Sequence, residues 1–271
     1  MLLQRVITAL ILAPLVVAGI YLLPFAVYAL VFWGLAAMGA WEWARLSGLT
    51  TVLPRAVFVA VFALTAALSW MFPASFTPLL WVGAGVWVLA AILVATYPKS
   101  SALIRRGWFA AILGQITILV AWVALLVVRA APDGASWLLW ALLLVWSADI
   151  GAYFVGHRFG RRKLAPSVSP GKTWEGFWGG MASSLLIGGG LLIAAVDGVL
   201  PGEISLLLLW SAIILGLGAV SVIGDLFESI LKRARGVKNS GSLLPGHGGL
   251  LDRIDSILAV LPVFALILGS V

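Results

Sequence analysis

The chain has 271 residues, of which 63% are apolar or aromatic and 10% are charged, with a formal net charge of +7. A soluble globular domain is about half apolar and a quarter charged, so this composition excludes one. Long uncharged stretches indicate membrane-spanning helices, because each span needs about 20 consecutive apolar residues. The sequence contains no cysteine, which excludes disulfides, thiolate metal sites and a thiol nucleophile.

The uncharged stretches predict about nine spans once prolines divide the two longest. Residues 6–41 and 56–98 are each too long for one helix; Pro24 breaks the first, and Pro73 and Pro78 break the second. The predicted spans are 6–23, 25–44, 56–72, 79–97, 108–129, 136–156, 176–196, 204–227 and 251–270. They fill the chain and predict one all-α, polytopic integral membrane domain, with spans one to five in 1–130 and spans six to nine in 131–271.

The basic residues predict the orientation of these spans. Fifteen of the 17 Lys and Arg fall on one face of the nine-span map, while Arg129 lies on the other face and Arg253 starts the last span. By the positive-inside rule the amino terminus is cytoplasmic and the carboxyl terminus lies outside. Topology alone explains the basic residues of the shorter loops, but the loops after spans six and eight are longer and indicate a further role.

Most acidic residues lie at one depth of the membrane. Seven of the ten fall within or beside spans on the cytoplasmic side: Glu42, Asp149, Glu175, Asp225, Glu228, Asp252 and Asp255. Ionisable groups at membrane depth are costly and face protein or water, so these carboxylates indicate a shared polar cavity.

Four of these acids form two pairs on either side of one loop. Asp225 and Glu228 end span eight, Asp252 and Asp255 start span nine, and a spacing of three puts each pair on one helical face. Carboxylate oxygens suit Mg²⁺. A single pair could simply neutralise nearby Lys and Arg at the interface, but two pairs meeting across a loop favour a metal site.

The loop between the pairs, residues 229–249, has the composition of a polyphosphate site. Four basic residues precede a Gly, Ser and Pro-rich turn that ends in Gly248 and Gly249, just before the helix of Asp252. Glycines allow close backbone approach, and the N–H groups of a helix start favour phosphate. His247 could be a general acid or base, a phosphate donor, or a structural hydrogen-bonding group, and the sequence leaves these alternatives open.

A second basic element follows span six, in SVSPGKTWEG at residues 167–176. It is not a Walker A motif, because Pro166 stands where that motif needs glycine. Lys172 and Thr173 at a helix start could still hold phosphate. Capping by Ser169 or Thr173 is the alternative, but capping does not explain Lys172.

The run SILKRARGVKNSGSLLPGHGGLLDRID, from Ser229 to Asp255, resembles the signature of the phosphatidate cytidylyltransferases, the CDP-diacylglycerol synthases. The resemblance extends to GDLFES in span eight, to ADIGAYFVGHRFGRRKLAPSVSPGKTWEG at residues 148–176, and to AWEWARL around Glu42. It is strong in the carboxyl-terminal half and looser in the amino-terminal half. One departure is Asn239, where the family usually has aspartate; we expect asparagine to replace it well in a turn.

The resemblance implies transfer of the cytidylyl group from CTP to phosphatidic acid, giving CDP-diacylglycerol and pyrophosphate. The depth of the acids places the expected site at the cytoplasmic membrane surface, and the compact length and the lack of a transit segment favour a bacterial inner membrane. The carboxylate pairs favour Mg²⁺ as cofactor, with Mn²⁺ as a substitute, and no nucleic-acid partner is expected. A homodimer is one option for the assembly. The expected metal ligands are Asp225, Asp252, Asp255 and Glu228. The expected catalytic groups are Asp225, Asp252, Asp255, His247 and Lys238. The expected substrate-binding residues are Ser169, Lys172, Thr173, Lys232, Arg233, Gly248, Gly249 and Arg253.

Two alternatives remain at this stage. A secondary transporter of an anionic solute would place polar groups at the membrane midplane in broken helices, whereas here the charges crowd one face. Another CTP-dependent lipid transferase or kinase would share the same sequence features, so the product alone separates it from the expected reaction.

Overall fold

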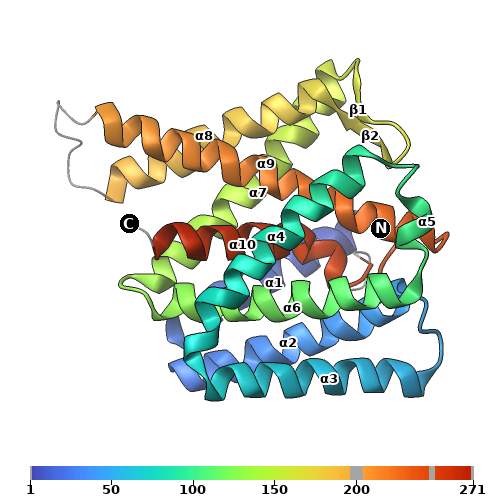
Figure 1. The fold of residues 1–271 in the computed structure, drawn as a ribbon. Coiled ribbons are helices and arrows are strands. Elements are labelled where there is room, and N and C mark those ends of the chain that lie inside the picture. Colours follow the sequence, from blue (N-terminus) through green and yellow to red (C-terminus); the bar gives the residue numbers. More distant parts are fainter. Residues whose placement is uncertain (1, 196–203, 244–247, 270–271) are drawn as a thin grey trace.

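The computed structural model describes residues 2–195, 204–243 and 248–269, and the chain forms a bundle of long helices (Figure 1). The helices are α1 (Leu2–Leu22), α2 (Phe25–Leu46), α3 (Val52–Met71), α4 (Phe76–Ala95), α5 (Ser101–Ile104), α6 (Gly107–Ala130), α7 (Gly134–Phe159), α8 (Trp174–Ala195), α9 (Ile204–Ala234) and α10 (Leu251–Leu268), with a short 3-10 turn at Pro73–Ser75. The all-α prediction is confirmed, apart from one short strand pair, and each long helix corresponds to one predicted span.

Seven of the described helices, α2, α3, α4, α6, α7, α8 and α9, are long and apolar enough to cross a membrane. The helix α1 contributes a shorter apolar stretch, Leu10–Leu22. The helix α10 has 18 residues and carries Asp252, Arg253 and Asp255 near its start. The protein is therefore an integral membrane protein by its helices, while the count of nine spans and the orientation stay predictions.

Two local features differ from the sequence expectation. The helix α9 was predicted to end near residue 227 but continues to Ala234, so Lys232 and Arg233 lie on the helix and not in a loop. Basic side chains in a last turn interact favourably with the helix dipole. The helix ends where Gly236 takes a positive φ of 66° and the Val237 amide donates to the Lys232 carbonyl at 3.1 Å, which is a Schellman ending.

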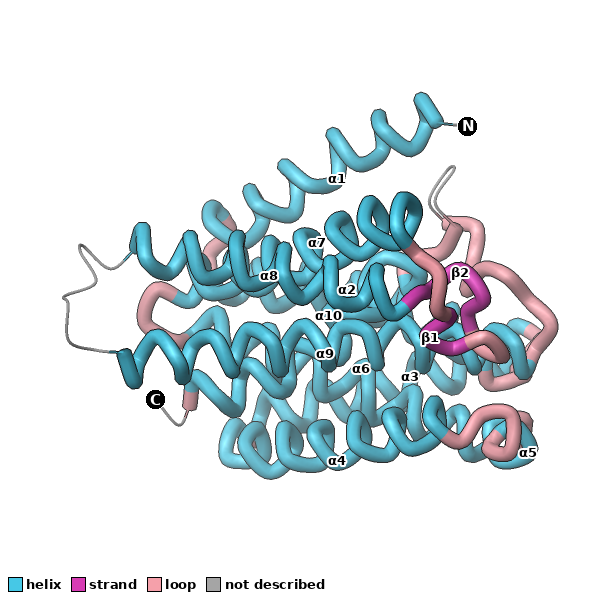
Figure 2. Tube along the Cα trace, turned by 90° about the horizontal axis from the view of Figure 1, so that it is seen from above, coloured by secondary structure: helices cyan, strands magenta, loops and turns pink. Residues whose placement is uncertain are grey.

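The second difference is an antiparallel hairpin where a loop was expected. Strand β1 (Lys163–Ala165) pairs with strand β2 (Ser169–Thr173), and α8 follows directly. Figure 2 places this hairpin at the same end of the bundle as α5, and α5 contacts α9. That end of the bundle brings the basic segments after α7 and α9 together.

The helices α6 and α10 form the centre of the packing. Helix α6 contacts α2, α3, α4, α7 and α10, and its side chains are more buried than those of the other membrane-length helices. Gly114 of α6 lies against the Trp43 ring, where a Cβ atom would overlap the indole, and Trp43 donates its Nε1–H to the Ala110 carbonyl at 2.9 Å. This close approach of α2 to α6 holds Glu42, the neighbour of Trp43, inside the bundle.

Candidate active site

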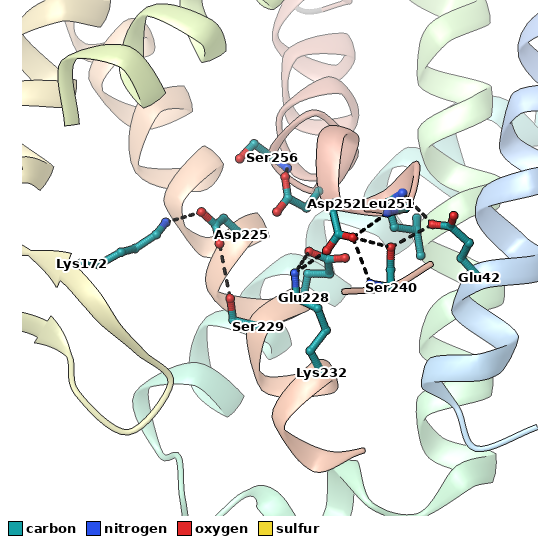
Figure 3. Close-up of polar contacts among 12 residues, drawn as sticks. Glu42, Lys172, Asp225, Glu228, Ser229, Lys232, Ser240, Leu251, Asp252 and Ser256 are labelled. Atoms are coloured by element: carbon teal, nitrogen blue, oxygen red, sulfur yellow. Dashed lines mark hydrogen bonds and ion pairs between the residues drawn. The ribbon is translucent and has the colours of Figure 1, made fainter. Parts of the chain in front are cut away.

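The site lies where the carboxyl-terminal part of α9, the start of α10, α2 and strand β2 meet (Figure 3). Its centre is Lys232, whose ammonium donates to Glu228 Oε2 at 2.6 Å and to Asp252 Oδ1 at 2.7 Å. The three side chains are 15%, 4% and 7% exposed, respectively. One partly buried cation therefore joins an acid of α9 to an acid of α10, which brings the two predicted acid pairs together.

The two oxygens of Asp252 have different partners. Oδ2 accepts hydrogen bonds from the Gly249 amide at 2.8 Å and the Ser240 amide at 3.0 Å, with the Ser240 hydroxyl at 3.1 Å. Oδ1 faces Lys232. Backbone donors thus fix one oxygen in the protein framework, and the other is directed toward the cluster of charges. In the described structure the ion-pair partner of Asp252 is Lys232, not the adjacent Arg253.

Asp255 is the second acid of the pair on α10. Its Oδ1 accepts a hydrogen bond from the Ser256 amide at 2.7 Å, and its side chain interacts with Glu228. Asp255 and Glu228 both line a small cavity, whose other walls include Trp43, Trp87 and Phe227. Within the described residues no hydrogen-bond partner reaches the buried Oε1 of Glu228. Acid oxygens therefore face a pocket with aromatic walls, where charge is poorly screened.

A second ion pair connects the hairpin to α9. Lys172 of β2 donates to Asp225 Oδ2 at 2.6 Å, and both side chains are partly exposed, at 26% and 32%. The Ser229 hydroxyl lies 3.4 Å from Asp225 Oδ1. Asp149 of α7 interacts electrostatically with Lys172 and Asp225. Lys172 thus lies beside the acids, and its role in binding phosphate stays a prediction.

The remaining predicted binding residues divide into structural and peripheral positions. Thr173 accepts the Gly176 amide at 3.1 Å and caps α8, which is the capping alternative. Arg233 donates from Nε to the Val168 carbonyl at 3.2 Å and fastens the hairpin to α9. Ser169 begins β2, and Lys238 and Arg253 are exposed.

The glycines of the predicted phosphate cradle lie in the turn before α10. The Gly249 amide donates to Asp252 and is therefore engaged within the protein. Gly248 has a positive φ of 88°, which suits glycine at this turn. His247 lies outside the described residues. Carboxylates therefore accept the Gly249, Leu250 and Leu251 amides in this structure, and phosphate binding by Gly248 and Gly249 stays a prediction.

Three residues of the site received no specific role from the sequence. Glu42, Ser240 and Arg235 all make buried or partly buried hydrogen bonds around the loop between α9 and α10. Glu42 was recognisable as an acid at membrane depth, but its partners lie about 200 positions away, with a separation of 209 for the Leu251 amide. Neither Ser240 nor Arg235 has a sequence signal that separates it from its neighbours.

The acids of the site suit a divalent metal by their chemistry more than by their spacing. Within 2–195, 204–243 and 248–269, no three His, Cys, Asp or Glu side chains are gathered closely enough to hold a metal ion. The donors nevertheless suit one chemically, because they are carboxylate oxygens and Glu228 Oε1 lacks a protein partner in the described part of the chain. In this arrangement the ammonium group of Lys172 pairs with Asp225, and that of Lys232 pairs with Glu228 and Asp252.

Paired acids and lysines in a bundle of membrane-length helices are the charges of an integral membrane protein that could bind anions and a divalent cation. The chain belongs to the cytidylyltransferase family, whose model matches residues 3–271. It is therefore a nucleotidyltransferase.

Curated relatives agree with this family. The chain is 43% identical over 270 residues to a phosphatidate cytidylyltransferase of Pseudomonas aeruginosa, covering 100% of this chain and 98% of the relative. It is 37% identical over 286 residues to that of Haemophilus influenzae, covering 98% of each. A Bacillus subtilis protein of the same name is 46% identical over 136 residues, covering 50% of this chain and 48% of the relative.

Proposed function

We propose that the chain transfers the cytidylyl group of CTP to phosphatidic acid, giving CDP-diacylglycerol and pyrophosphate. The names of the full-length relatives support this reaction. The observation that carries it in the structure is the buried Glu228–Lys232–Asp252 cluster beside the Lys172–Asp225 pair. These groups combine the two charges that the reaction needs, cations for phosphates and acids for a metal.

The reaction forms one bond and breaks one. A phosphate oxygen of the lipid attacks the alpha phosphorus of CTP, a new phosphoanhydride bond forms, and the bond from that phosphorus to the pyrophosphate oxygen breaks. The attacking oxygen is already anionic, so the protein does not need to supply an activated nucleophile. Its task is to hold two anions together and to stabilise the charge on the leaving pyrophosphate.

Lys172 and Lys232 are the cations placed for this task. Each is held by acids in the structure, Lys172 by Asp225 and Lys232 by Glu228 and Asp252. Incoming phosphate oxygens would compete with Asp225, Glu228 and Asp252 for these ammonium groups. The lysines then orient the phosphates, and the acids become available to another cation.

Asp225, Glu228, Asp252 and Asp255 are the residues that would hold Mg²⁺. When bound, the ion would neutralise phosphate charge and polarise the reacting phosphoryl group. Asp252 would contribute Oδ1, because backbone amides hold its Oδ2. Glu228 would contribute the Oε1 that has no described protein partner. The acid–base role of His247 stays a prediction.

The site is proposed to face the cytoplasm from a bacterial inner membrane. The bacterial relatives and the crowding of basic residues near this end support that placement. A site at this depth admits CTP from water and phosphatidic acid from the adjoining leaflet. A homodimer stays a prediction.

The test uses purified protein in detergent with labelled CTP and phosphatidic acid, with and without Mg²⁺. We expect label in CDP-diacylglycerol and release of pyrophosphate, both dependent on the divalent ion. A phosphorylated lipid product would identify a kinase instead, and incorporation into a polyprenyl phosphate alone would identify another lipid transferase. Uptake of solute into vesicles without label transfer would identify a transporter.

A further inference from the structure

Glu42 is the most enclosed carboxylate that the proposed reaction leaves without a role. It is 5% exposed and lies on α2, which contributes no proposed metal ligand or phosphate-binding group. Its Oε1 accepts the Leu250 amide at 3.0 Å, and its Oε2 accepts the Leu251 amide at 2.9 Å and the Ser240 hydroxyl at 2.9 Å. A buried charge is tolerated when it is fully hydrogen-bonded, and here all three donors come from the segment that carries Asp252.

These contacts make Glu42 a cap for α10 supplied by another helix. The residue at the N-cap position is Leu250, which cannot accept a hydrogen bond through its side chain. The first amides of a helix need acceptors, and negative charge at a helix start is favourable. Glu42 satisfies the Leu250 and Leu251 amides, and Asp252 satisfies that of Gly249.

Ser240 connects the two acids directly. Its hydroxyl lies 2.9 Å from Glu42 Oε2 and 3.1 Å from Asp252 Oδ2, while its own amide donates to Asp252 at 3.0 Å. The hydroxyl has one proton, and the amide already serves Asp252. The arrangement therefore uses the hydroxyl for Glu42 and the amide for Asp252, so that the position of Ser240 sets the distance between the acids.

The surrounding backbone leaves little room for adjustment. Ser240 is fully buried, and a Cβ atom at Gly241 or Gly249 would overlap the Glu42 carboxylate. The start of the same loop is fixed to α2 by Arg235, whose guanidinium donates to the Leu46 and Ser47 carbonyls, each at 2.8 Å. Both ends of the loop thus return to α2, and Figure 3 shows Glu42 and Asp252 on opposite sides of Ser240.

We infer that Glu42, acting through Ser240 and the first amides of α10, is a positioning residue that holds the Asp252 carboxylate in its reactive orientation. Glu42 does not touch substrate in this assignment. The inference rests on the proposed function, because it gives Asp252 a role in turnover. It also gives a reason for the contact between α2 and the start of α10, the helix that carries Asp252.

The experiment compares Glu42→Gln, Ser240→Ala and the double variant with wild type in the labelled-CTP assay. Partners of this kind, when removed, typically cost about ten- to a hundredfold in activity, and we expect this loss in kcat with the KM for CTP within about threefold, about 0.7 kcal/mol. Because both side chains act through one pathway, the double variant should lose no more than the worse single variant. Ser184→Ala is the matched control, since the Ser184 hydroxyl is fully buried and donates to its own helix at Gly180.

A second readout does not depend on activity. Hydrogen exchange at the Leu250 and Leu251 amides should accelerate in Glu42→Gln, while exchange in α6 stays at the wild-type rate. Turnover within about twofold of wild type, about 0.4 kcal/mol, in folded Glu42→Gln would overturn the inference. Losses that multiply in the double variant, or that match the unfolded fraction, would also overturn it. A wild-type protein without CTP turnover would instead refute the proposed function, and the exchange measurement would still report on Glu42.

Discussion

Replacement of Asp252 by asparagine separates its place in the framework from its charge. In Asp252→Asn the amide oxygen can take the position of Oδ2 and keep the Ser240 and Gly249 amides as partners. The NH₂ group then replaces Oδ1 opposite the Lys232 ammonium, where the structure has a 2.7 Å ion pair. The substitution therefore keeps the loop contacts and removes the negative charge directed toward the cluster.

The expected magnitudes follow from those contacts. Loss of one hydrogen bond to a charged group costs about 1.5–3 kcal/mol of stability, and the fold should tolerate this because Lys232 keeps Glu228 as a partner. Turnover should fall by at least about a hundredfold, about 2.7 kcal/mol of barrier, which is typical for removal of one electrostatic stabiliser. Turnover is thus expected to fall strongly in a protein that loses one contact and still folds.

The assay measures CTP turnover of Asp252→Asn over a titration of Mg²⁺ and Mn²⁺, together with a melting curve in the same detergent. A protein that still folds, with a melting temperature lowered by several degrees and strongly reduced turnover, is the expected result. Near-normal turnover, or a loss that equals the unfolded fraction, would refute the assignment of Asp252 and leave it a structural residue of the loop.

Four further predictions address other parts of the site. Lys232→Met removes the cation between two acids, so Mg²⁺ should raise its melting temperature more than that of wild type; equal shifts would contradict a metal at these acids. Lys172→Gln should lower kcat/KM by about tenfold or more, because it removes about 1.4 kcal/mol of binding to the phosphate in the transition state. An unchanged kcat/KM would mean that Lys172 only anchors the hairpin. Asn239→Asp should change the rate by less than about tenfold, about 1.4 kcal/mol, while a gain beyond about a hundredfold would show that an acid belongs there. Cysteines at Ser101 and at Gly202, which lies outside the described residues, should react from opposite membrane faces, and labelling from one face would contradict the nine-span map.

Local sequence patterns were sufficient for the helices. The predicted span 108–129 and the observed Gly107–Ala130 differ by one residue at each end, because uncharged length and flanking charge are properties of the segment itself. The end of α9 was predicted poorly, since Lys232 looks like a loop residue until its partners are known. Its helical position is stabilised by Glu228 one turn earlier and Asp252 on α10.

The sequence by itself determined the membrane class, the approximate spans and the acids at one depth, all from composition and short-range spacing. Only the tertiary structure decided how the acids are used. It directed Asp252 Oδ1 toward Lys232, engaged the Gly249 amide, and placed Glu42 at the start of α10. The physical reason is that a buried carboxylate must find donors wherever the fold brings them. For Glu42 the Ser240 hydroxyl is 198 positions along the chain, a separation at which no local pattern carries information.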